Sequence, residues 1–516
     1  MKHTPLFDRH MRDASQVINL KNFARAMHYA GHVAEHLATR QGVTLCDVSH
    51  MGEFDFRGPD ALKLVQKIIT NDAGKLAVNQ ALYSAMCNEK GDVLDDLLCY
   101  RLGEDHFVWV VNVTKTDDDF QWVLKHADGM NVEIANIATD TALLALQGPS
   151  SREVLQRIAK ADLSSLKYYW LVQTAVMTGA GEIPCMISRT GYTGEIGYEV
   201  MVARDLAPAV WDELLRAGRP LGITEHGVAA RESLRTEAGY LLNGNDMDGK
   251  TNPFEAGIGW TVKLSKDFIG RDALAKLKDG PYRRRMVGLE IDGDTTMRKG
   301  YRIFHGNKDV GEVTSGPISR AIAGRNLGLG YVAPDCAALG TEIEIDIHGR
   351  RRKGRVVAMP LRERRCKDEP AVRTLSPYGL KFSEAHMWAA PVDGKPGIVA
   401  VGLSDFGQRI LGDVLCVELP KIGDKVAKGQ AAGWGDSYRR AFDLASPVAG
   451  EVVAVDGALA KNPSHLNAYP YKSGGAFQVR VSSPADLDAL MPLDRYMDLT
   501  RRLAAYDSWS RDLRMT

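Results

Sequence analysis

A change of hydrophobic pattern near residue 280 constrains this chain most, because it separates two kinds of folding unit. Before it, helical and extended patterns alternate. Residues 61–72 carry apolar side chains at helical spacing, and residues 81–102 predict two strands around a turn at 88–92. Residues 20–42 are also expected to be helical. The first 280 residues therefore predict a mixed α+β region.

After Pro281 the pattern consists of short strands separated by glycine turns, with almost no helical spacing. This pattern predicts a small antiparallel β-barrel over residues 281–365. The charged, proline-containing stretch 366–377 is expected to be a linker with little to bury. A third unit, residues 378–516, again shows short strands and turns, and it ends in a predicted helix near 484–506.

Length and charge agree with a globular protein of several domains. The chain has 516 residues, too many for one hydrophobic core, and its 65 Lys and Arg equal its 65 Asp and Glu. No net field therefore favours nucleic acid or an anionic membrane. The polar N-terminal segment and the lack of an apolar stretch of about 20 residues predict a cytoplasmic protein.

Cysteine and histidine spacing gives no support for a metal site. The seven cysteines form no CxxC pair, and the thirteen histidines include no HExxH motif. We therefore expect reduced thiols and no bound metal.

Several segments of the first 365 residues follow the order typical of one family. They include HYAGHVAEHLATRQGVTLCDVSHM, ALYSAMCNEKGDVLDDLLCY, RTGYTGEIGYEV and GVAARESLRTEAGYLLNGNDMD. The region resembles glycine cleavage T-proteins along its whole length. The resemblance implies T-protein-like folate-binding domains in residues 1–280, with tetrahydrofolate as the cofactor of a one-carbon transferase.

The resemblance also implies how folate is held. Glu195 matches the family's pterin-binding glutamate, and a carboxylate can accept two parallel hydrogen bonds from a pterin N–H and its amino group. Arg231 matches the arginine that binds the glutamate tail, since a guanidinium fits a carboxylate. Arg235, one helical turn further on, is expected to be a packing or ion-pair residue.

Asp95 is the expected catalytic residue, because it matches the aspartate that manages protons near the attacking folate nitrogen in the family. Neighbouring side chains of a strand point to opposite faces, so Asp95 and Asp96 cannot both enter one pocket. We therefore expect Asp96 to make only a solvent or turn contact.

Further residues match positions near the folate or donor pocket of the family, although a methionine or aromatic in an apolar run is more often core. The expected cofactor-binding residues are Tyr83, Met51, Asn112, Tyr192 and Trp260, and the expected donor-facing residues are His50 and Tyr29.

Residues 378–499 resemble the H-protein, a β-rich hammerhead domain that carries lipoate on a hairpin lysine. Here the hairpin reads GDSYRRAFDLASPV, with Arg439 at the lysine position. A guanidinium stays protonated and cannot form the lipoyl amide, so we expect no lipoate. Lys425 and Lys428 lie in the preceding turn and are poor substitutes.

Three functions remain open from the sequence. The first is an aminomethyltransferase served by a separate lipoylated H-protein, with the fused domain as scaffold or regulator. The second is a folate-dependent demethylase of a free methylated small molecule, which the loss of the lysine favours. The third is a folate-binding protein without catalysis. None of the three involves nucleic acid or a membrane.

Overall fold

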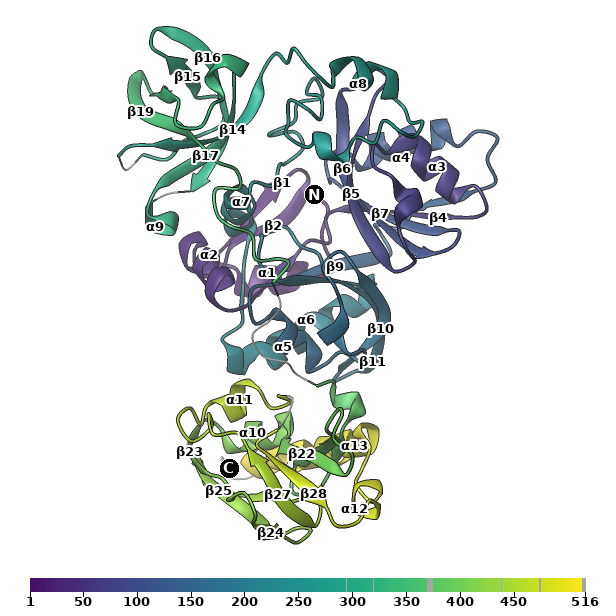
Figure 1. The fold of residues 1–516 in the computed structure, drawn as a ribbon, viewed down its shortest axis with the longest axis vertical. Helices are drawn as coiled ribbons and strands as arrows, with labels where there is room; N and C mark the ends of the chain where they lie inside the picture. Colours follow the sequence, from purple (N-terminus) through teal and green to yellow (C-terminus); the bar gives the residue numbers. More distant parts are fainter. Residues whose placement is uncertain (294, 319, 369–374, 438, 473–474, 513–516) are drawn as a thin grey trace.

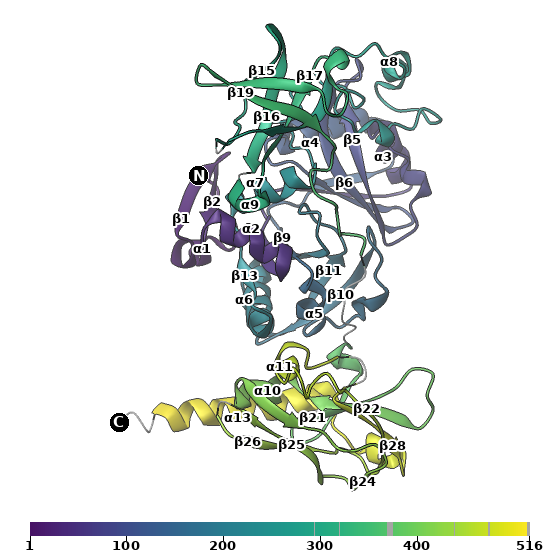
Figure 2. The same cartoon turned by 60° about the vertical axis from the view of Figure 1, so that its left-hand side comes forward.

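A computed structural model describes residues 1–516 except 294, 319, 369–374, 438, 473–474 and 513–516. Figure 1 shows an upper body of several lobes and a separate lower domain, and Figure 2 shows the same division from another side. The predicted α+β fold is confirmed, and the barrel and the β-rich last unit are both present.

The first lobe is built on a five-stranded sheet in the order β5-β6-β7-β4-β8. Its strands are β4 (Gly52–Arg57), β5 (Gln80–Cys87), β6 (Val93–Gly103), β7 (His106–Val111) and β8 (Glu133–Asn136). Helices α3 (Ala61–Ile68) and α4 (Thr116–His126) cover one face, where Leu64, Val65 and Val123 are buried. The helix and the hairpin expected in this region are both confirmed.

A second lobe contains a six-stranded sheet in the order β10-β11-β12-β9-β3-β13. Its strands are β3 (Thr44–Asp47), β9 (Thr141–Gln147), β10 (Leu171–Thr178), β11 (Gly181–Ser188), β12 (Gly197–Ala203) and β13 (Thr224–Glu225). Helices α5 (Ser151–Gln156) and α6 (Ala207–Gly218) pack on its outer face. Its inner face meets the first sheet through a shared core that includes Tyr100, Val108, Ala145 and Met201.

The expectation of one helix over residues 20–42 is wrong. Strands β1 (Gln16–Leu20) and β2 (Phe23–His28) form a hairpin, and helix α2 (His32–Gln41) begins only after Gly31. Lys21 and Asn22 take left-handed φ values of 54° and 66° in the tight turn. Three consecutive residues of β2, Ala24 to Ala26, are buried, so the helical interpretation was wrong about which elements cover this segment.

Helix α7 (Val228–Glu237) joins the lobes, since it packs against α2, β2 and the barrel strand β16. The barrel is closed in the order β14-β17-β16-β15-β18-β19. Its strands are β14 (Arg285–Ile291), β15 (Arg302–His305), β16 (Lys308–Ile318), β17 (Asn326–Val332), β18 (Glu342–Ile347) and β19 (Arg350–Val357). Helix α8 (Arg271–Leu277) precedes the barrel in sequence, and helix α9 (Arg320–Ala323) connects β16 and β17.

The stretch expected to be a linker begins as packed structure. Cys366 is buried beside Tyr240, and the Asp368 carbonyl accepts a hydrogen bond from Arg189. Cys366 therefore makes buried contacts that the linker expectation did not include, whereas Lys367 and Asp368 are exposed as expected of a linker. Residues 369–374 of this expected linker lie outside the described residues.

The last unit contains a six-stranded sheet, β20-β21-β22-β28-β27-β24, and a three-stranded sheet, β23-β25-β26. The strands are β20 (Lys381–Phe382), β21 (Met387–Pro391), β22 (Ile398–Leu403), β23 (Val414–Glu418), β24 (Lys425–Val426), β25 (Ala431–Ser437), β26 (Ala441–Ala445), β27 (Gly450–Val455) and β28 (Phe477–Val481). Its helices are α10 (Asp405–Leu411), α11 (His465–Ala468), α12 (Ala485–Asp488) and α13 (Leu493–Asp512). The expected terminal helix is thus α12 and α13 together.

The last unit docks on the outer helices of the second lobe. Asp405 at the start of α10 lies 3.1 Å from Arg216 of α6 and 3.7 Å from Arg157. Arg157 also donates to the carbonyls of Asn467 and Ala468 in α11. The docked unit is therefore separated from the inner face of this lobe by a layer of helices and a sheet.

Candidate functional site

Strands β5 and β6 place the two neighbouring aspartates on opposite faces of the first sheet. Asp95 lies opposite Met86, on the face that the helices cover, and it is fully buried. Asp96 lies opposite Ala85 on the other face, where Tyr83 donates to its Oδ2 at 3.0 Å. The alternation predicted from the sequence is correct, but Asp96 is no solvent contact, since it is 9% exposed and hydrogen-bonded.

Asp95 is enclosed by polar partners. The Asn112 backbone N–H donates to its Oδ2 at 3.0 Å and the Asn112 Nδ2 to its Oδ1 at 2.8 Å. Asp119 of α4 stands against it, and burial together with the charge of Asp95 raises the pKa of Asp119 far above its usual range. The raised pKa favours the neutral form of Asp119 next to Asp95.

Asp96 is held at a pKa suited to proton transfer. The same Asn112 amide donates to its Oδ1 at 3.1 Å and to its carbonyl at 3.0 Å. Burial first, and the charge of Asp95 second, raise the pKa of Asp96 to about 7. A carboxyl group with such a pKa can accept or give up a proton at physiological pH.

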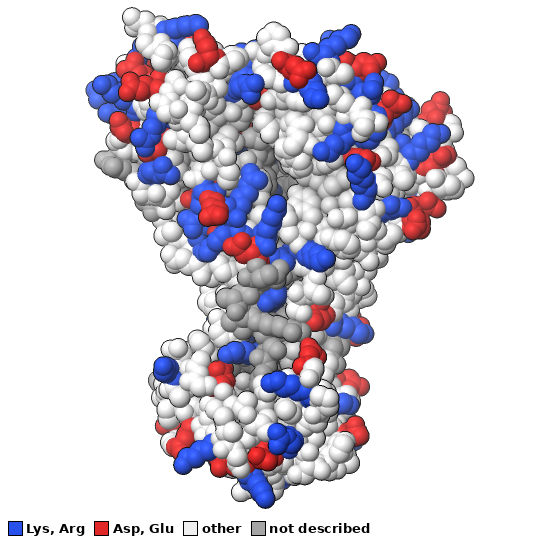
Figure 3. All heavy atoms as spheres, in the orientation of Figure 1, with Lys and Arg blue, Asp and Glu red and all other residues white. Residues whose placement is uncertain are grey.

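Two stacked pairs of aromatic side chains lie on the same side of the first sheet as Asp96. The rings of Tyr83 and Trp260 stack at 5.8 Å between centroids, and those of Tyr192 and Tyr240 stack at 5.7 Å. Trp260 is 60% exposed although Tyr83 beside it is largely covered. Figure 3 shows the surface hollowed between the barrel and the first lobe. Exposed aromatic faces next to a buried carboxyl suit a flat, polar ligand.

Arg231 projects from α7 into this region. Its guanidinium lies 4.5 Å from the centroid of the Tyr192 ring, a cation–π contact. The structure thus brings Tyr83, Asn112, Tyr192, Trp260 and Arg231 together around Asp96. Met51 is partly buried and packs against the core between the two sheets.

Glu195 is not part of this group. Its Oε1 lies 3.1 Å from Arg40 and its Oε2 lies 2.8 Å from Arg365, so both oxygens are engaged in ion pairs. Arg40 and Arg365 line a separate cavity together with Arg362. The expectation that Glu195 binds the pterin does not fit this arrangement, because a pterin would have to displace two arginines.

Glu199 is the carboxylate that the sequence reasoning missed. It lies in β12 on the inner face with Met201, is 8% exposed, and accepts a hydrogen bond from Thr190. Burial raises the pKa of Glu199, while the positive charge of Arg231 opposes that shift. Strand alternation over Gly197–Ala203 was the available signal, since it puts residues 199 and 201 on one face.

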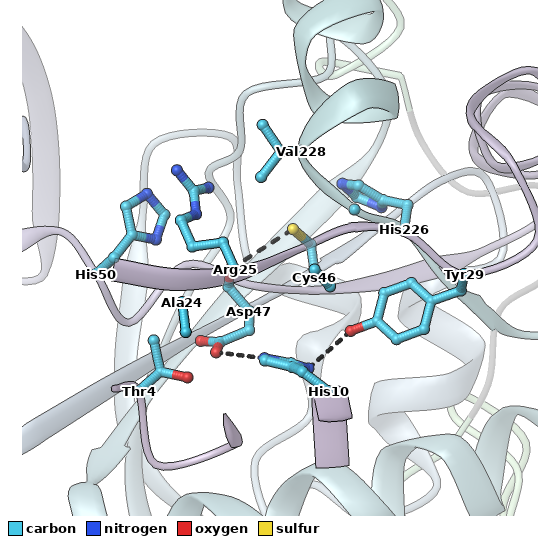
Figure 4. Close-up of a pocket in the computed structure, with 12 residues that line it drawn as sticks. Thr4, His10, Ala24, Arg25, Tyr29, Cys46, Asp47, His50, His226 and Val228 are labelled. Carbon is cyan, nitrogen blue, oxygen red and sulfur yellow. Dashed lines mark hydrogen bonds and ion pairs between the residues drawn. The ribbon is translucent and has the colours of Figure 1, made fainter. Parts of the chain in front are cut away.

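His50 and Tyr29 border a different cavity, shown in Figure 4 with Arg25, Cys46 and His226. The Tyr29 hydroxyl lies 2.8 Å from His10 Nδ1, and His10 Nε2 lies 2.8 Å from Asp47. His50 Nδ1 is buried and has no hydrogen-bond partner within the described residues. The two residues therefore line the same cavity from opposite sides, and Tyr29 is committed to a hydrogen-bond chain.

Comparison with known families gives three consecutive matches. The GCVT N-terminal domain covers residues 6–266, the glycine cleavage T-protein C-terminal barrel domain covers 284–362, and the glycine cleavage H-protein covers 380–502. A relative from Halothermothrix orenii, named aminomethyltransferase, is 42% identical over 361 residues, which are 70% of this chain and 99% of that relative. The chain belongs to the glycine cleavage T-protein family.

Other members agree with this assignment. An aminomethyltransferase from Thermotoga maritima is 41% identical over 333 residues, 64% of this chain and 90% of the relative. The crystal structure of the glycine cleavage system aminomethyltransferase T from Bartonella henselae matches with a TM-score of 0.64 and 31% identity. The match covers 70% of this chain and 99% of the Bartonella henselae chain. The remaining part of the chain is the H-protein family domain.

The described residues hold no group of three or more His, Cys, Asp or Glu side chains arranged for a metal ion. No helix among them is long and apolar enough to cross a membrane. Lys and Arg alternate with Asp and Glu over the face drawn in Figure 3, in keeping with the neutral composition.

Proposed function

We propose that this chain is a tetrahydrofolate-dependent one-carbon transferase of the aminomethyltransferase type, acting on an amine-type donor. The carrying observation is Asp96, a buried carboxyl with a pKa near neutrality that faces the Tyr83 and Trp260 rings. Family membership over the first 365 residues supports the same function. Folate binding without catalysis would give the raised pKa of the Asp96 carboxyl group no role.

The residues around Asp96 fit a reduced folate. Glu199 offers a carboxylate for the pterin N–H groups, and Trp260 with Tyr83 offers a stacking surface. Arg231 supplies a cation for a folate carboxylate. Tetrahydrofolate supplies the nucleophilic nitrogen that accepts the one-carbon unit. Asp96 would hold or remove the proton at that position, while the Asn112 amide keeps Asp96 in place and the charge of Asp95 helps to raise its pKa.

The function is tested by incubating the full chain with tetrahydrofolate and candidate donors, followed by mass spectrometry of the folate products. One set of donors is an aminomethyl-loaded, lipoylated H-protein, and the other is a set of free methylated amines. Formation of a one-carbon folate with either set supports the proposal. Folate that remains unmodified with both sets contradicts it.

Glutamine substitutions distinguish the two glutamates. Glu199→Gln should weaken tetrahydrofolate binding by about 1.5–3 kcal/mol, because a charge-assisted hydrogen bond becomes neutral. Glu195→Gln is the matched control and should leave that affinity within about twofold, since its partners are Arg40 and Arg365. Calorimetric titration measures both. If only Glu195→Gln weakens tetrahydrofolate binding, then Glu195, and not Glu199, binds the pterin.

The placement of the H-protein family domain favours a free small molecule as the donor. Arg439 lies in the turn between β25 and β26, and its guanidinium donates to the Ile410 carbonyl at 3.4 Å. The H-protein family domain docks on α5 and α6, on the side of the second lobe away from Asp96. A donor carried by this domain has no route to Asp96 in this arrangement.

Intact-mass analysis tests the loss of lipoate. Protein produced in a lipoylating host should carry no lipoyl group, because Arg439 has no nucleophilic amine. Arg439→Lys is the control, since it supplies the amine on the same hairpin. A lipoyl adduct on the unaltered chain would contradict the proposal and would indicate a self-contained fusion of the two proteins.

A further inference from the structure

An open pocket lies between α2, α9 and the chain that follows the barrel strand β19. Helices α2 and α9 lie side by side in both views of the ribbon (Figures 1 and 2). The pocket has a volume of about 490 Å³, within the range of about 300–1,000 Å³ that is usual for small-molecule sites. The group of residues around Asp96 contributes nothing to its lining, so it is separate from the proposed folate site.

Arginine dominates the polar part of this pocket. Arg40 comes from α2, and Arg362 and Arg365 come from the chain after β19. The Arg40 guanidinium lies 2.7 Å from Glu237 and 3.1 Å from Glu195. The Arg365 guanidinium lies 2.8 Å from the other carboxylate oxygen of Glu195. Among the pocket arginines and their direct partners, three guanidinium groups therefore stand against two carboxylates, which leaves one positive charge in excess.

The excess charge belongs to Arg362. Its backbone N–H donates to the Glu237 carbonyl at 3.0 Å, which anchors this residue beside the pocket. Within the part of the chain that the structure describes, the exposed Arg362 guanidinium has no hydrogen bond or ion pair. Arg365 Nε is buried and also has no hydrogen-bond partner among the described residues. Both arginines therefore keep donors for a further acceptor.

The two carboxylates lie beneath the arginines and do not line the pocket. Glu195 and Glu237 are 3% and 2% exposed, whereas the Arg365 side chain is 38% exposed. His36 does line the pocket, but burial lowers the pKa of His36, so its ring is neutral at physiological pH. An incoming ligand therefore meets guanidinium groups, and no carboxylate belongs to the described lining.

Apolar side chains line another part of the pocket. Leu37, Pro149 and Ile322 are all half-buried, so each presents some carbon surface to the pocket. Carbon surface beside a few polar groups suits the body of an organic molecule. Guanidinium groups are planar and bind phosphate oxygens through two parallel hydrogen bonds. The two kinds of lining together fit an organic molecule that carries a phosphate group.

We propose that this pocket binds a small phosphate monoester, with Arg362 and Arg365 on the phosphate and the apolar side chains against the organic part. The proposal goes beyond the transferase reaction and does not depend on it. A phosphate monoester carries about 1.5–2 negative charges at pH 7 and three acceptor oxygens, so it matches the excess charge and the free donors better than one carboxylate does. Nucleotides and sugar phosphates share this chemistry and differ by the base.

Calorimetry with the full chain compares adenosine monophosphate, ribose phosphate and adenosine as probes. Adenosine monophosphate should bind about 10- to 100-fold tighter than adenosine, because only the phosphate accepts charge-assisted hydrogen bonds. Ribose phosphate that binds as tightly as adenosine monophosphate would identify a sugar phosphate as the ligand, and weaker binding would identify a nucleotide. Equal binding of adenosine monophosphate and adenosine, or no binding of either phosphate ester, would overturn the proposal.

Two arginine variants locate the bound probe. Arg362→Met should reduce the affinity for adenosine monophosphate by about 10-fold or more and leave the thermal midpoint unchanged, because this exposed side chain has no partner to lose. Arg364→Met is the matched control. Arg364 carries the same charge but lies outside the pocket lining, where it donates to the Ala238 carbonyl at 2.6 Å and stacks on the Tyr240 ring. Its loss should leave the affinity within about twofold.

Equal losses of affinity in the two variants would show that the overall positive charge of this segment attracts the probe, and would overturn the proposal. A dicarboxylate separates phosphate recognition from charge alone. Glutarate carries about two negative charges at neutral pH and should bind about 10-fold more weakly than ribose phosphate. Glutarate that binds as tightly would make the pocket a general anion site, open to the carboxylates of a folate tail, and would overturn the assignment to phosphate.

Discussion

Asp96→Asn is expected to lower kcat by about 10²–10⁴-fold and to leave tetrahydrofolate affinity nearly unchanged. The amide keeps the shape of the side chain and its contact with Tyr83, but it cannot take a proton. Because burial and Asp95 raise the pKa of Asp96 to about 7, the ionised form is lost as pH falls through that value. If Asp96 is a base, kcat should therefore fall on the acidic side of about pH 7, and this limb should vanish in the variant.

Asp95→Asn serves as the matched control. Asp95 faces the helices and is held by Asn112 and Asp119, so its replacement should act mainly by loosening that arrangement. We expect a smaller loss of kcat with the acidic limb of the pH profile retained. If Asp95→Asn abolishes turnover and Asp96→Asn does not, the proton-handling role belongs to Asp95, as the sequence alone suggested. Steady-state kinetics over a range of pH decide between them.

Arg235→Met is expected to destabilise the protein by about 3–5 kcal/mol, the usual effect of leaving a buried charge unpaired. The Arg235 guanidinium lies 2.5 Å from Asp246, and both side chains are fully buried. It also donates to Ser315 Oγ at 2.9 Å and so connects α7 to the barrel strand β16. This confirms Arg235 as the ion-pair residue that its helical position predicted.

Urea unfolding of single and double variants measures this effect. Asp246→Asn combined with Arg235→Met removes both charges and should recover part of the lost stability, because the buried carboxylate is no longer left alone. A loss below about 1 kcal/mol for Arg235→Met would contradict the assignment. A double variant no more stable than the single one would show that Ser315 and packing, not Asp246, carry the effect.

The fold was largely predictable because most of its signals are local. The hairpin of β5 and β6 and the barrel follow from strand alternation and glycine turns within short segments. The hairpin of β1 and β2 was missed because its alternation is short and a helix, α2, follows at once.

The site was less predictable because it depends on which face of each sheet is covered. Strand alternation separates Asp95 from Asp96, but only the packing of α3 and α4 decides which of them is enclosed. Glu195 and Glu199 differ in the same way, because distant Arg40 and Arg365 determine the environment of Glu195. Contacts between residues more than 100 positions apart carry no signal in a single sequence.

The docking of Asp405 between Arg157 and Arg216 has a consequence for how the last domain behaves. If the two parts were separate proteins, their association through these contacts would depend on their concentrations. On one chain the partners meet at an effective concentration in the millimolar range, so that weak contacts suffice to keep them together. The fused domain therefore stays bound to the outer helices of the second lobe at any protein concentration, and it does not need a high affinity for them.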